Sequence, residues 1–193
     1  MKTQIWIAIK IFALFTLLLG VVYPLFITGI AQLAFPGKAN GSLIMKENKV
    51  IGSELIGQKF DSVRYFSSRP SAIEYSPMPS GGSNLGPTSS KLQQLVIDRK
   101  AQFLEFNQLS EPENVPCEML FASASGLDPH ISPKAALLQV DRIVKSRHFD
   151  NNKKQQLLNS IEVLSEGPQF SFLGENRINV LALNLELDKL NNK

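Results

Sequence analysis

The chain has 193 residues, with 20 lysines and arginines against 17 aspartates and glutamates, for a formal net charge of +3. The basic residues are scattered apart from the Lys153-Lys154 pair, so the chain lacks the clustered basic face that nucleic-acid binding requires, and we expect no nucleic-acid partner. Cys117 is the only cysteine, which excludes an intrachain disulfide. We expect its side chain to be small and buried rather than a reactive thiol.

A long apolar segment dominates the N-terminal part of the chain. No residue from Ile11 to Gly37 is charged, and Ile7 to Ile30 is long enough to cross about 30 Å of hydrocarbon. We therefore predict three segments: a cytoplasmic N-terminus (1–10), a transmembrane helix (11–35, with its core at about 7–30) and one extracytoplasmic domain (36–193).

The orientation of this helix follows from the charges that precede it. Lys2 and Lys10 are basic and no acidic residue accompanies them, so the positive-inside rule predicts a single-pass protein with a cytoplasmic N-terminus. The alternative is a cleaved signal peptide with Gly29-Ile30-Ala31 as its cleavage site. Apolar residues continue past that site through Leu33 to Phe35, which favours a retained helix. Both alternatives export the same domain.

Short strands and one long loop are expected in the first half of the domain. Ser42–Met45 follows an Asn40-Gly41 turn signal and reads as a strand, and Val63–Phe66 reads as a second one. Residues 73–90 are rich in proline, glycine and serine, which predicts a loop.

Helical spacing predicts three helices after that loop. The first is capped within Thr88–Ser90 and continues to about Asn107. The second begins at Ser132-Pro133, because proline at the first helical position loses only an N–H that would have no partner. The third covers about Asn152–Ser165 and stops at Gly167-Pro168. Their expected buried positions are Leu92, Leu95, Val96, Arg99, Phe103 and Phe106; Leu137, Val140 and Val144; and Leu157, Leu158, Ile161 and Leu164.

The C-terminal segment Ile178–Leu187 is expected to be a buried strand. Leucines alternate along it at positions 181, 183, 185 and 187, while Val180 and Ala182 begin an apolar second face. The predicted fold is therefore a single N-terminal transmembrane helix followed by one mixed α/β (α+β) domain.

Several classes of chemistry are excluded by missing motifs. The chain has neither the Gly-x-x-x-x-Gly-Lys-Ser/Thr loop of P-loop ATPases nor the Asp-Lys-Thr-Gly segment of P-type ATPases, so we expect no ATP hydrolysis. His130 and His148 are the only histidines, and with one cysteine they give no metal-ligand spacing. We expect no metal site and no catalytic residue.

Two loops keep alternative interpretations open. Ser125, Asp128 and His130 could form a hydrolase site, but the chain has no Gly-x-Ser-x-Gly elbow, and Asp128-Pro129 favours a tight turn instead. The glycine-rich loop Ser80–Gly86 could wrap an anion with its amides or could be a flexible loop, and the loop reading is favoured because no lysine follows.

The order of short motifs along the chain is more informative than any single one. They are Tyr23-Pro24-Leu25, Thr28-Gly29, Ala31-Gln32, Phe35-Pro36, Ala39–Ile44, Gly52-Ser53, Leu55-Ile56-Gly57-Gln58, Tyr65-Phe66, Arg69-Pro70-Ser71-Ala72, Tyr75, Ser80–Thr88, Ser125–Pro133, Gln139 with Arg142, and Asn179-Val180-Leu181 with Leu185 and Asp188. Together they resemble the C-subunit (KdpC) family of the Kdp potassium-transporting P-type ATPases over about residues 23–188. The chain departs from that family at Cys117–Phe121 and at Ala124.

This resemblance implies a non-catalytic subunit of a bacterial potassium uptake pump in the plasma (inner) membrane. The implied partners are the lipid bilayer, a channel-like A subunit that carries potassium, and a B subunit that hydrolyses ATP. The implied role is assembly and stabilisation, together with catalytic chaperoning that raises the ATP affinity of the B subunit. No tightly bound cofactor is implied, because ATP acts through the complex and potassium is the transported ion.

The resemblance also suggests site residues. The glycine-rich loop is similar to the Leu-Ser-Gly-Gly-Gln signature of ABC transporters, which implies nucleotide contact at Ser80, Gly81, Gly82, Ser83 and Asn84. Interface or ion-entry candidates are Arg69, Tyr75, Asp128, His130, Gln139 and Arg142. Small and polar residues of the membrane helix are candidates for helix packing, namely Gly20, Pro24, Thr28 and Gly29.

The predicted topology argues against direct nucleotide contact. If residues 36–193 lie outside the cell, the glycine-rich loop faces a compartment with little ATP. An effect on the nucleotide site would then be a coupling free energy of about 1 to 3 kcal/mol carried through a partner. Two functions therefore remain, an accessory subunit and, as the alternative, a membrane-tethered hydrolase using Ser125, Asp128 and His130.

Overall fold

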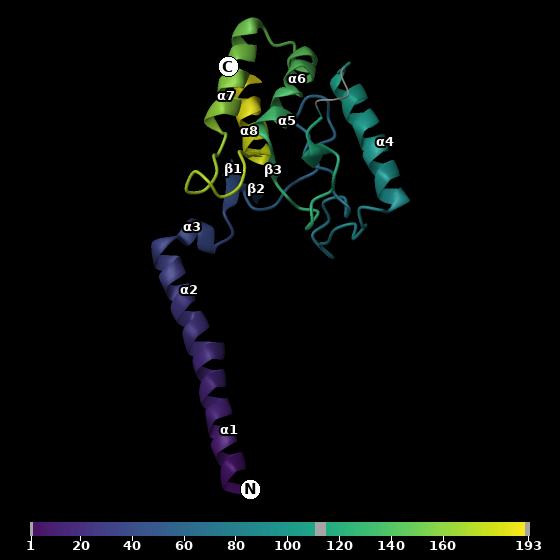
Figure 1. Ribbon diagram of the computed structural model, residues 1–193. Coiled ribbons are helices and arrows are strands. Elements are labelled where there is room, and N and C mark those ends of the chain that lie inside the picture. The colour runs from purple at the N-terminus through teal and green to yellow at the C-terminus, as the bar shows by residue number, and fades with distance from the viewer. Residues whose placement is uncertain (1, 111–114, 192–193) are drawn as a thin grey trace. The chain divides into compact units, whose positions relative to one another are not determined.

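The computed structural model describes residues 2–110 and 115–191 (Figure 1). The chain divides into two compact units, residues 1–53 and residues 54–193. Each unit is described by itself.

A continuous helix forms most of the first unit. It consists of α1 (Lys2–Leu17), a π-helical turn (Leu18–Val22) and α2 (Tyr23–Ala34). Over Lys2–Ala34 its mean hydropathy reaches 2.5 and none of the most apolar window is buried, so its length and composition allow it to cross a membrane. In the π-turn the Tyr23 amide donates to the Leu18 carbonyl, directly before Pro24, which has no N–H to donate.

A β-hairpin follows the helix. The short helix α3 (Pro36–Ala39) leads through a turn at Asn40-Gly41 into β1 (Leu43–Lys46), which pairs antiparallel with β2 (Lys49–Ser53). The predicted turn and the strand expected at Ser42–Met45 are confirmed to within one residue.

Helices dominate the second unit, while residues 54–89 contain neither helix nor strand. In chain order its elements are α4 (Ser90–Asn107), the 3-10 helix η3 (Cys117–Met119), β3 (His130–Ile131), α5 (Pro133–Leu137), α6 (Val140–Arg147), α7 (Asn151–Val163), β4 (Ile178–Asn179) and α8 (Val180–Asn191). β3 and β4 pair antiparallel through two residues each. The predicted mixture of helix and strand is thus confirmed, with very little strand.

The core of the second unit lies among its C-terminal helices. α7 packs on α5, α6 and α8, and α4 packs on α6 (Figure 1). Ile143, Leu157, Leu183 and Leu187 are completely buried there, and Phe66 from the irregular segment joins them. Burial of such side chains contributes about 1.5 to 3 kcal/mol each.

Side-chain caps confirm the predicted helix starts. The Ser89 hydroxyl accepts from the Leu92 amide, the Ser132 hydroxyl accepts from the Ala135 amide, and the Asp150 carboxylate caps α7. The second predicted helix is broken at Leu138-Gln139 into α5 and α6. This break leaves Leu137 half-exposed, so its predicted burial is wrong.

Buried positions within the predicted helices agree in part. Leu157, Ile161, Val140 and Phe103 are buried as expected. The other expected positions are only partly buried: Leu92, Leu95, Val96, Arg99, Phe106, Val144, Leu158 and Leu164. Cys117 is exposed at the start of η3, so its expected burial is wrong.

The predicted strand Ile178–Leu187 is wrong beyond its first two residues. The Asn179 side chain accepts from the Ala182 amide at 3.0 Å and so caps a helix that begins at Val180. Val180, Leu183, Asn184 and Leu187 are buried, and this spacing is helical. The leucines at every second position therefore lie on a helix, and their alternation does not indicate a strand here.

The strand expected at Val63–Phe66 is also wrong, because this segment is a turn. Its carbonyls accept from arginine side chains rather than from a neighbouring strand. The Val63 and Tyr65 carbonyls bind Arg142, and the Arg64 carbonyl accepts from Arg147.

Candidate functional site

The two loops that attracted interest in the sequence lie against each other. The Gly81 amide donates to the Ser125 carbonyl at 3.1 Å. A Cβ on Gly82 would stand 3.0 Å from the Ala124 carbonyl oxygen, and Gly126 adopts a positive φ of 71°. Small residues therefore allow residues 80–86 to close onto the turn at residues 123–128.

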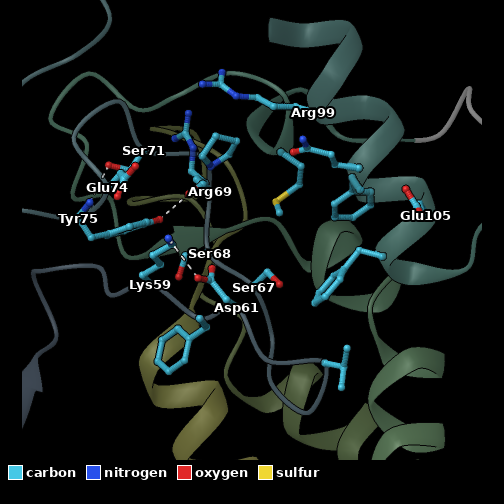
Figure 2. A pocket seen from close by; sticks show the side chains of 17 residues that line it. Lys59, Asp61, Ser67, Ser68, Arg69, Ser71, Glu74, Tyr75, Arg99 and Glu105 are labelled. Carbon is cyan, nitrogen blue, oxygen red and sulfur yellow. Dashed lines mark hydrogen bonds and ion pairs between the residues drawn. The ribbon is translucent and has the colours of Figure 1, made fainter.

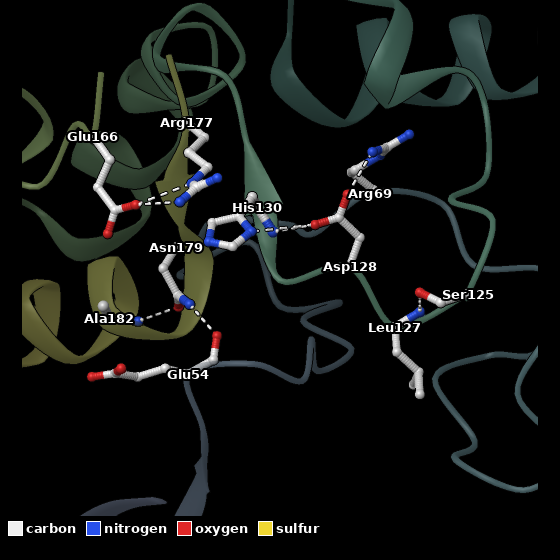
Figure 3. A network of polar contacts seen from close by, with 10 residues as sticks. All are labelled: Glu54, Arg69, Ser125, Leu127, Asp128, His130, Glu166, Arg177, Asn179 and Ala182. Carbon is white, nitrogen blue, oxygen red and sulfur yellow. Dashed lines mark hydrogen bonds and ion pairs between the residues drawn. The ribbon is translucent and has the colours of Figure 1, made fainter. Parts of the chain in front are cut away.

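Asp128 is the centre of a charged cluster beside this contact (Figure 3). Its Oδ2 lies 2.6 Å from Nη1 of Arg69, while its Oδ1 accepts from the His130 amide at 2.9 Å and lies 3.4 Å from His130 Nδ1. Burial alone would raise the pKa of Asp128, but the hydrogen bonds of His130 and the charge of Arg69 outweigh burial and lower the pKa to about 2. The carboxylate is therefore ionised at neutral pH.

Tyr75 fastens the segment that carries Arg69. Its hydroxyl donates to the Arg69 carbonyl at 2.5 Å, and burial raises the pKa of Tyr75 to about 12, so the hydroxyl stays a donor. Gly57 packs against the backbone of residues 127 and 128. Its amide donates to the Leu127 carbonyl at 2.7 Å, and a Cβ at position 57 would lie only 2.6 Å from the Asp128 carbonyl oxygen.

The hydrolase alternative finds no support in this geometry. The Ser125 hydroxyl accepts from the Leu127 amide at 3.1 Å and lies on the other side of Asp128 from His130 (Figure 3). Within the described residues Ser125 has no hydrogen bond to His130, so no base is placed to activate it.

Gln139 and Arg142 lie inside the unit. Gln139 is fully buried and Arg142 is 3% exposed. The Arg142 guanidinium donates to Asn107 Oδ1 at 2.9 Å, to Gln139 Oε1 at 3.0 Å and to the Tyr65 carbonyl at 3.0 Å, and it stacks on the Phe106 ring. Burial lowers its pKa to about 10, which leaves it charged at neutral pH.

This buried network holds the irregular segment near residues 62–67 in place. The side-chain Oε1 of Gln139 accepts from the Ser67 amide at 2.8 Å, and the Asn184 side chain exchanges hydrogen bonds of 2.8 and 3.0 Å with the backbone of Phe66. Arg147 adds an ion pair of 2.9 Å to Asp188. Gln139 and Arg142 therefore support the site from within, and direct contact with a partner stays a prediction for both.

Asn107, Asn184 and Gly57 were missed by the sequence analysis. Asn184 lies among the leucines of α8, and Asn107 continues the buried stripe that contains Phe103. A polar residue on an apolar helical stripe is a usable signal, because such a residue must be hydrogen-bonded when buried.

Two pockets flank the cluster. The first has a volume of about 860 Å³ and lies between residues 59–75 and α4 (Figure 2). The second, of about 800 Å³, is lined by Asp128, His130, Cys117 and Arg177 among others. Arg69 lines both pockets, and its Nε is buried without a partner among the described residues.

Nucleotide contact at the glycine-rich loop stays a prediction. The Gly81 amide is already used by the Ser125 carbonyl, while Ser80, Ser83 and Asn84 are exposed. Among residues 2–110 and 115–191 no group of three or more His, Cys, Asp or Glu side chains is arranged to hold a metal ion.

The packing candidates on the membrane helix have free surfaces. Nothing lies within 4 Å of a Cβ built on Gly20 or Gly29, and Pro24 and Thr28 are exposed. Within residues 2–53 these four positions are therefore open to a neighbouring helix.

Comparison with known proteins matches nearly the whole chain. The family model described as "K+-transporting ATPase, c chain" matches residues 5–189. The chain is 47% identical over 187 residues to a protein of Geotalea uraniireducens, covering 95% of this chain and 96% of that protein. It is 44% identical over 198 residues to a protein of Dechloromonas aromatica, covering 98% and 99%, and 45% identical over 182 residues to one of Leptospira interrogans, covering 94% and 92%. All three relatives are described as potassium-transporting ATPase KdpC subunits.

Proposed function

The chain belongs to the KdpC family of potassium-transporting ATPase subunits, and from this premise we propose that it assembles and stabilises the uptake complex and raises the ATP affinity of its ATP-hydrolysing B subunit. It is an accessory subunit rather than the catalytic one, and potassium is the ion that the complex transports.

The closure of the glycine-rich loop is the observation that carries this proposal. Residues 80–84 fold onto Ala124 and Ser125 through a backbone hydrogen bond, and no lysine directly follows them in the sequence. Phosphate-binding loops need free amides and usually a lysine. The effect on ATP affinity is therefore proposed to pass through the partner subunits as a coupling free energy between distinct sites.

The membrane helix is proposed to dock on helices of the A and B subunits. Gly20 and Gly29 allow close approach of a neighbouring backbone, Thr28 can hydrogen-bond across the contact, and Pro24 shapes the helix beside its π-turn. The N-terminus is proposed to be cytoplasmic and residues 36–193 extracytoplasmic, because Lys2 and Lys10 precede the apolar segment without an acid.

The surface around Arg69, Asp128 and His130 is proposed to meet the A subunit near the potassium entry. These side chains are only partly buried, they line the second pocket, and Tyr75 holds the Arg69 segment firmly. Function tends to concentrate on loops held by a rigid scaffold, which here is the buried Gln139–Arg142 network.

Expression of the two large subunits with and without this chain tests the proposal. Mild detergent extraction should recover the two large subunits together in higher yield when the chain is present, and the ATPase of that complex should then require less ATP for half-maximal activity. A complex of equal yield and equal ATP affinity without the chain would refute both roles. Tight, stoichiometric ATP binding by the full chain alone, measured by calorimetry, would replace coupling at a distance by direct contact.

A further inference from the structure

The hairpin β1–β2 is fastened to the end of the membrane helix. The amides of Gln32 and Asn40 exchange two hydrogen bonds of 3.2 and 3.3 Å, and Asn40 also donates to the Pro36 carbonyl at 2.8 Å. The Ser53 hydroxyl at the end of β2 donates to the Gly41 carbonyl at 2.7 Å. Both ends of the hairpin are thus held within the turn that follows the helix.

One face of this hairpin is apolar and open. Met45 and Val50 pair across the two strands. The ladder has a bulge between Ile44 and Met45 whose extra residue, Ile51, lies on β2, so Leu43 and Met45 still alternate regularly along β1 and the three side chains share a face. They are 57%, 55% and 53% exposed, respectively. A two-stranded hairpin is marginally stable in water unless its apolar face is covered, so this face needs an occupant.

The hairpin also carries a net positive charge, from Lys46 and Lys49 against Glu47. Lys46 and Lys49 stand opposite each other as the last pair of the ladder, an arrangement that is destabilising for like charges. Glu47 lies at the tip, in a turn whose two central residues, Glu47 and Asn48, have positive φ. Over residues 2–110 and 115–191 no carboxylate forms an ion pair with Lys38, Lys46 or Lys49.

We propose that the hairpin lies on the bilayer surface, with Leu43, Met45 and Val50 in the interface and Lys38, Lys46 and Lys49 on the phosphates of anionic lipids. The interfacial region is only about 5 to 8 Å thick on each side, and the strands are roughly 15 Å long. An upright hairpin would therefore lift Lys46 and Lys49 beyond the headgroups, whereas a flat one keeps all three lysines among them. Long lysine side chains reach headgroups while their stems cover apolar surface.

Site-directed fluorescence on the full chain tests this inference. The exposed Cys117 is replaced (Cys117→Ser), Met45→Cys is labelled with a polarity-sensitive dye, and the chain is reconstituted into vesicles of phosphatidylcholine with phosphatidylglycerol that contain headgroup spin-labelled lipid. Val163→Cys is the matched control, because Val163 is an exposed apolar residue on α7 of the other unit. We expect the label at position 45 to be quenched at least about twofold more than the label at position 163.

The electrostatic part of the inference has its own variants. Lys46→Gln with Lys49→Gln should lower the quenching at position 45, and so should raising the salt to about 0.5 M, which screens surface charge. A third label at Leu18→Cys reports insertion of the helix itself through the blue shift of the polarity-sensitive dye, so a failed anchor is distinguishable from a failed hairpin contact. Equal quenching at positions 45 and 163, with the Leu18→Cys label blue-shifted, would overturn the inference. Shielding of position 45 that arises only in the assembled complex would assign this face to a partner protein and would also overturn it.

Discussion

Arg69 and Asp128 form an ion pair of 2.6 Å between segments that lie 59 residues apart in the chain. The pair ties the Tyr75-bound segment to the turn against which the glycine-rich loop closes. Because both side chains are roughly a quarter exposed, the pair belongs to the surface as well as to the scaffold. Changes to it should therefore affect both stability and assembly.

Loss of the Asp128 carboxylate should remove a pH dependence of stability. The folded-state pKa is about 2 against an ordinary 3.8, so the carboxylate stabilises the fold above about pH 4, and this contribution is lost as the pH falls from about 4 to 2. With allowance for solvent screening, we expect Asp128→Asn to lower the free energy of unfolding by about 1 to 2 kcal/mol at pH 7.

Urea unfolding of the full chain in detergent micelles measures this effect. The difference between wild type and Asp128→Asn should shrink from neutral pH toward about pH 2, because the wild-type carboxylate then becomes protonated. A difference that stays constant over this range would show that the carboxylate charge is not what stabilises the turn.

Removal of the buried guanidinium should be costly. Arg142→Met removes the donor to Asn107 Oδ1 and to the Tyr65 carbonyl, and one of the two donors to Gln139 Oε1 and to the Val63 carbonyl. We expect a loss of about 3 to 5 kcal/mol in the free energy of unfolding. Lys145→Met on the same helix is the control, because Lys145 makes one exposed hydrogen bond, and it should change stability by less than about 0.5 kcal/mol. Similar unfolding midpoints for the two variants would contradict a structural role for this network.

Local signals predicted the helix starts well, and tertiary contacts explain where prediction failed. The hydroxyls of Ser89 and Ser132 cap helices by accepting from amides three residues further on, so both partners of each hydrogen bond can be recognised within a short stretch of sequence. The Val63–Phe66 turn depends on Arg142 and Arg147, about 80 residues further on. No pattern within the segment itself encodes those partners.

The error at α8 has a local cause that was overlooked. Leucines at every second position resemble a strand, but Asn179 supplies a helix cap and Asn184 is buried at the spacing of Val180 and Leu187. Four of the predicted interface or ion-entry residues, Arg69, Tyr75, Asp128 and His130, do meet in one cluster, while their contact with a partner stays a prediction. The contact of Gly57 with Asp128 and Tyr75 was not predicted. Close packing between segments far apart in the chain produces no periodic pattern in the sequence of either segment.

Gly57 should not tolerate a side chain. A Cβ there would lie 2.6 Å from the Asp128 carbonyl oxygen and 2.9 Å from the Tyr75 ring, so Gly57→Ala should force the two segments apart and cost about 1 to 3 kcal/mol. Gly86→Ala is the matched control, because nothing lies within 4 Å of a Cβ at Gly86. Thermal unfolding of both full-length variants compares them. Equal melting temperatures would show that the segments around Asp128 and Tyr75 accommodate the added methyl group without loss of stability.

The charged cluster should matter to the complex, and Ser125 should not. We expect Asp128→Asn and His130→Ala to lower the yield of assembled complex or its potassium-stimulated ATPase activity, since both change the partly exposed surface beside the second pocket. Ser125→Ala removes only an acceptor for the Leu127 amide and should leave both quantities nearly unchanged. A large loss of activity with Ser125→Ala at normal assembly would revive the hydrolase alternative.

The membrane helix should be sensitive to bulk at its small residues. Gly20 lies within the π-turn and has no neighbour within 4 Å of a built Cβ, so a partner helix can approach its backbone closely there. Gly20→Leu would fill that space, whereas Leu18→Ala only removes surface, so we expect Gly20→Leu to reduce co-purification with the two large subunits more strongly. The comparison is the yield of complete complex per amount of this chain in the membrane. Equal yields for the two variants would show that the Gly20 face does not pack against a partner.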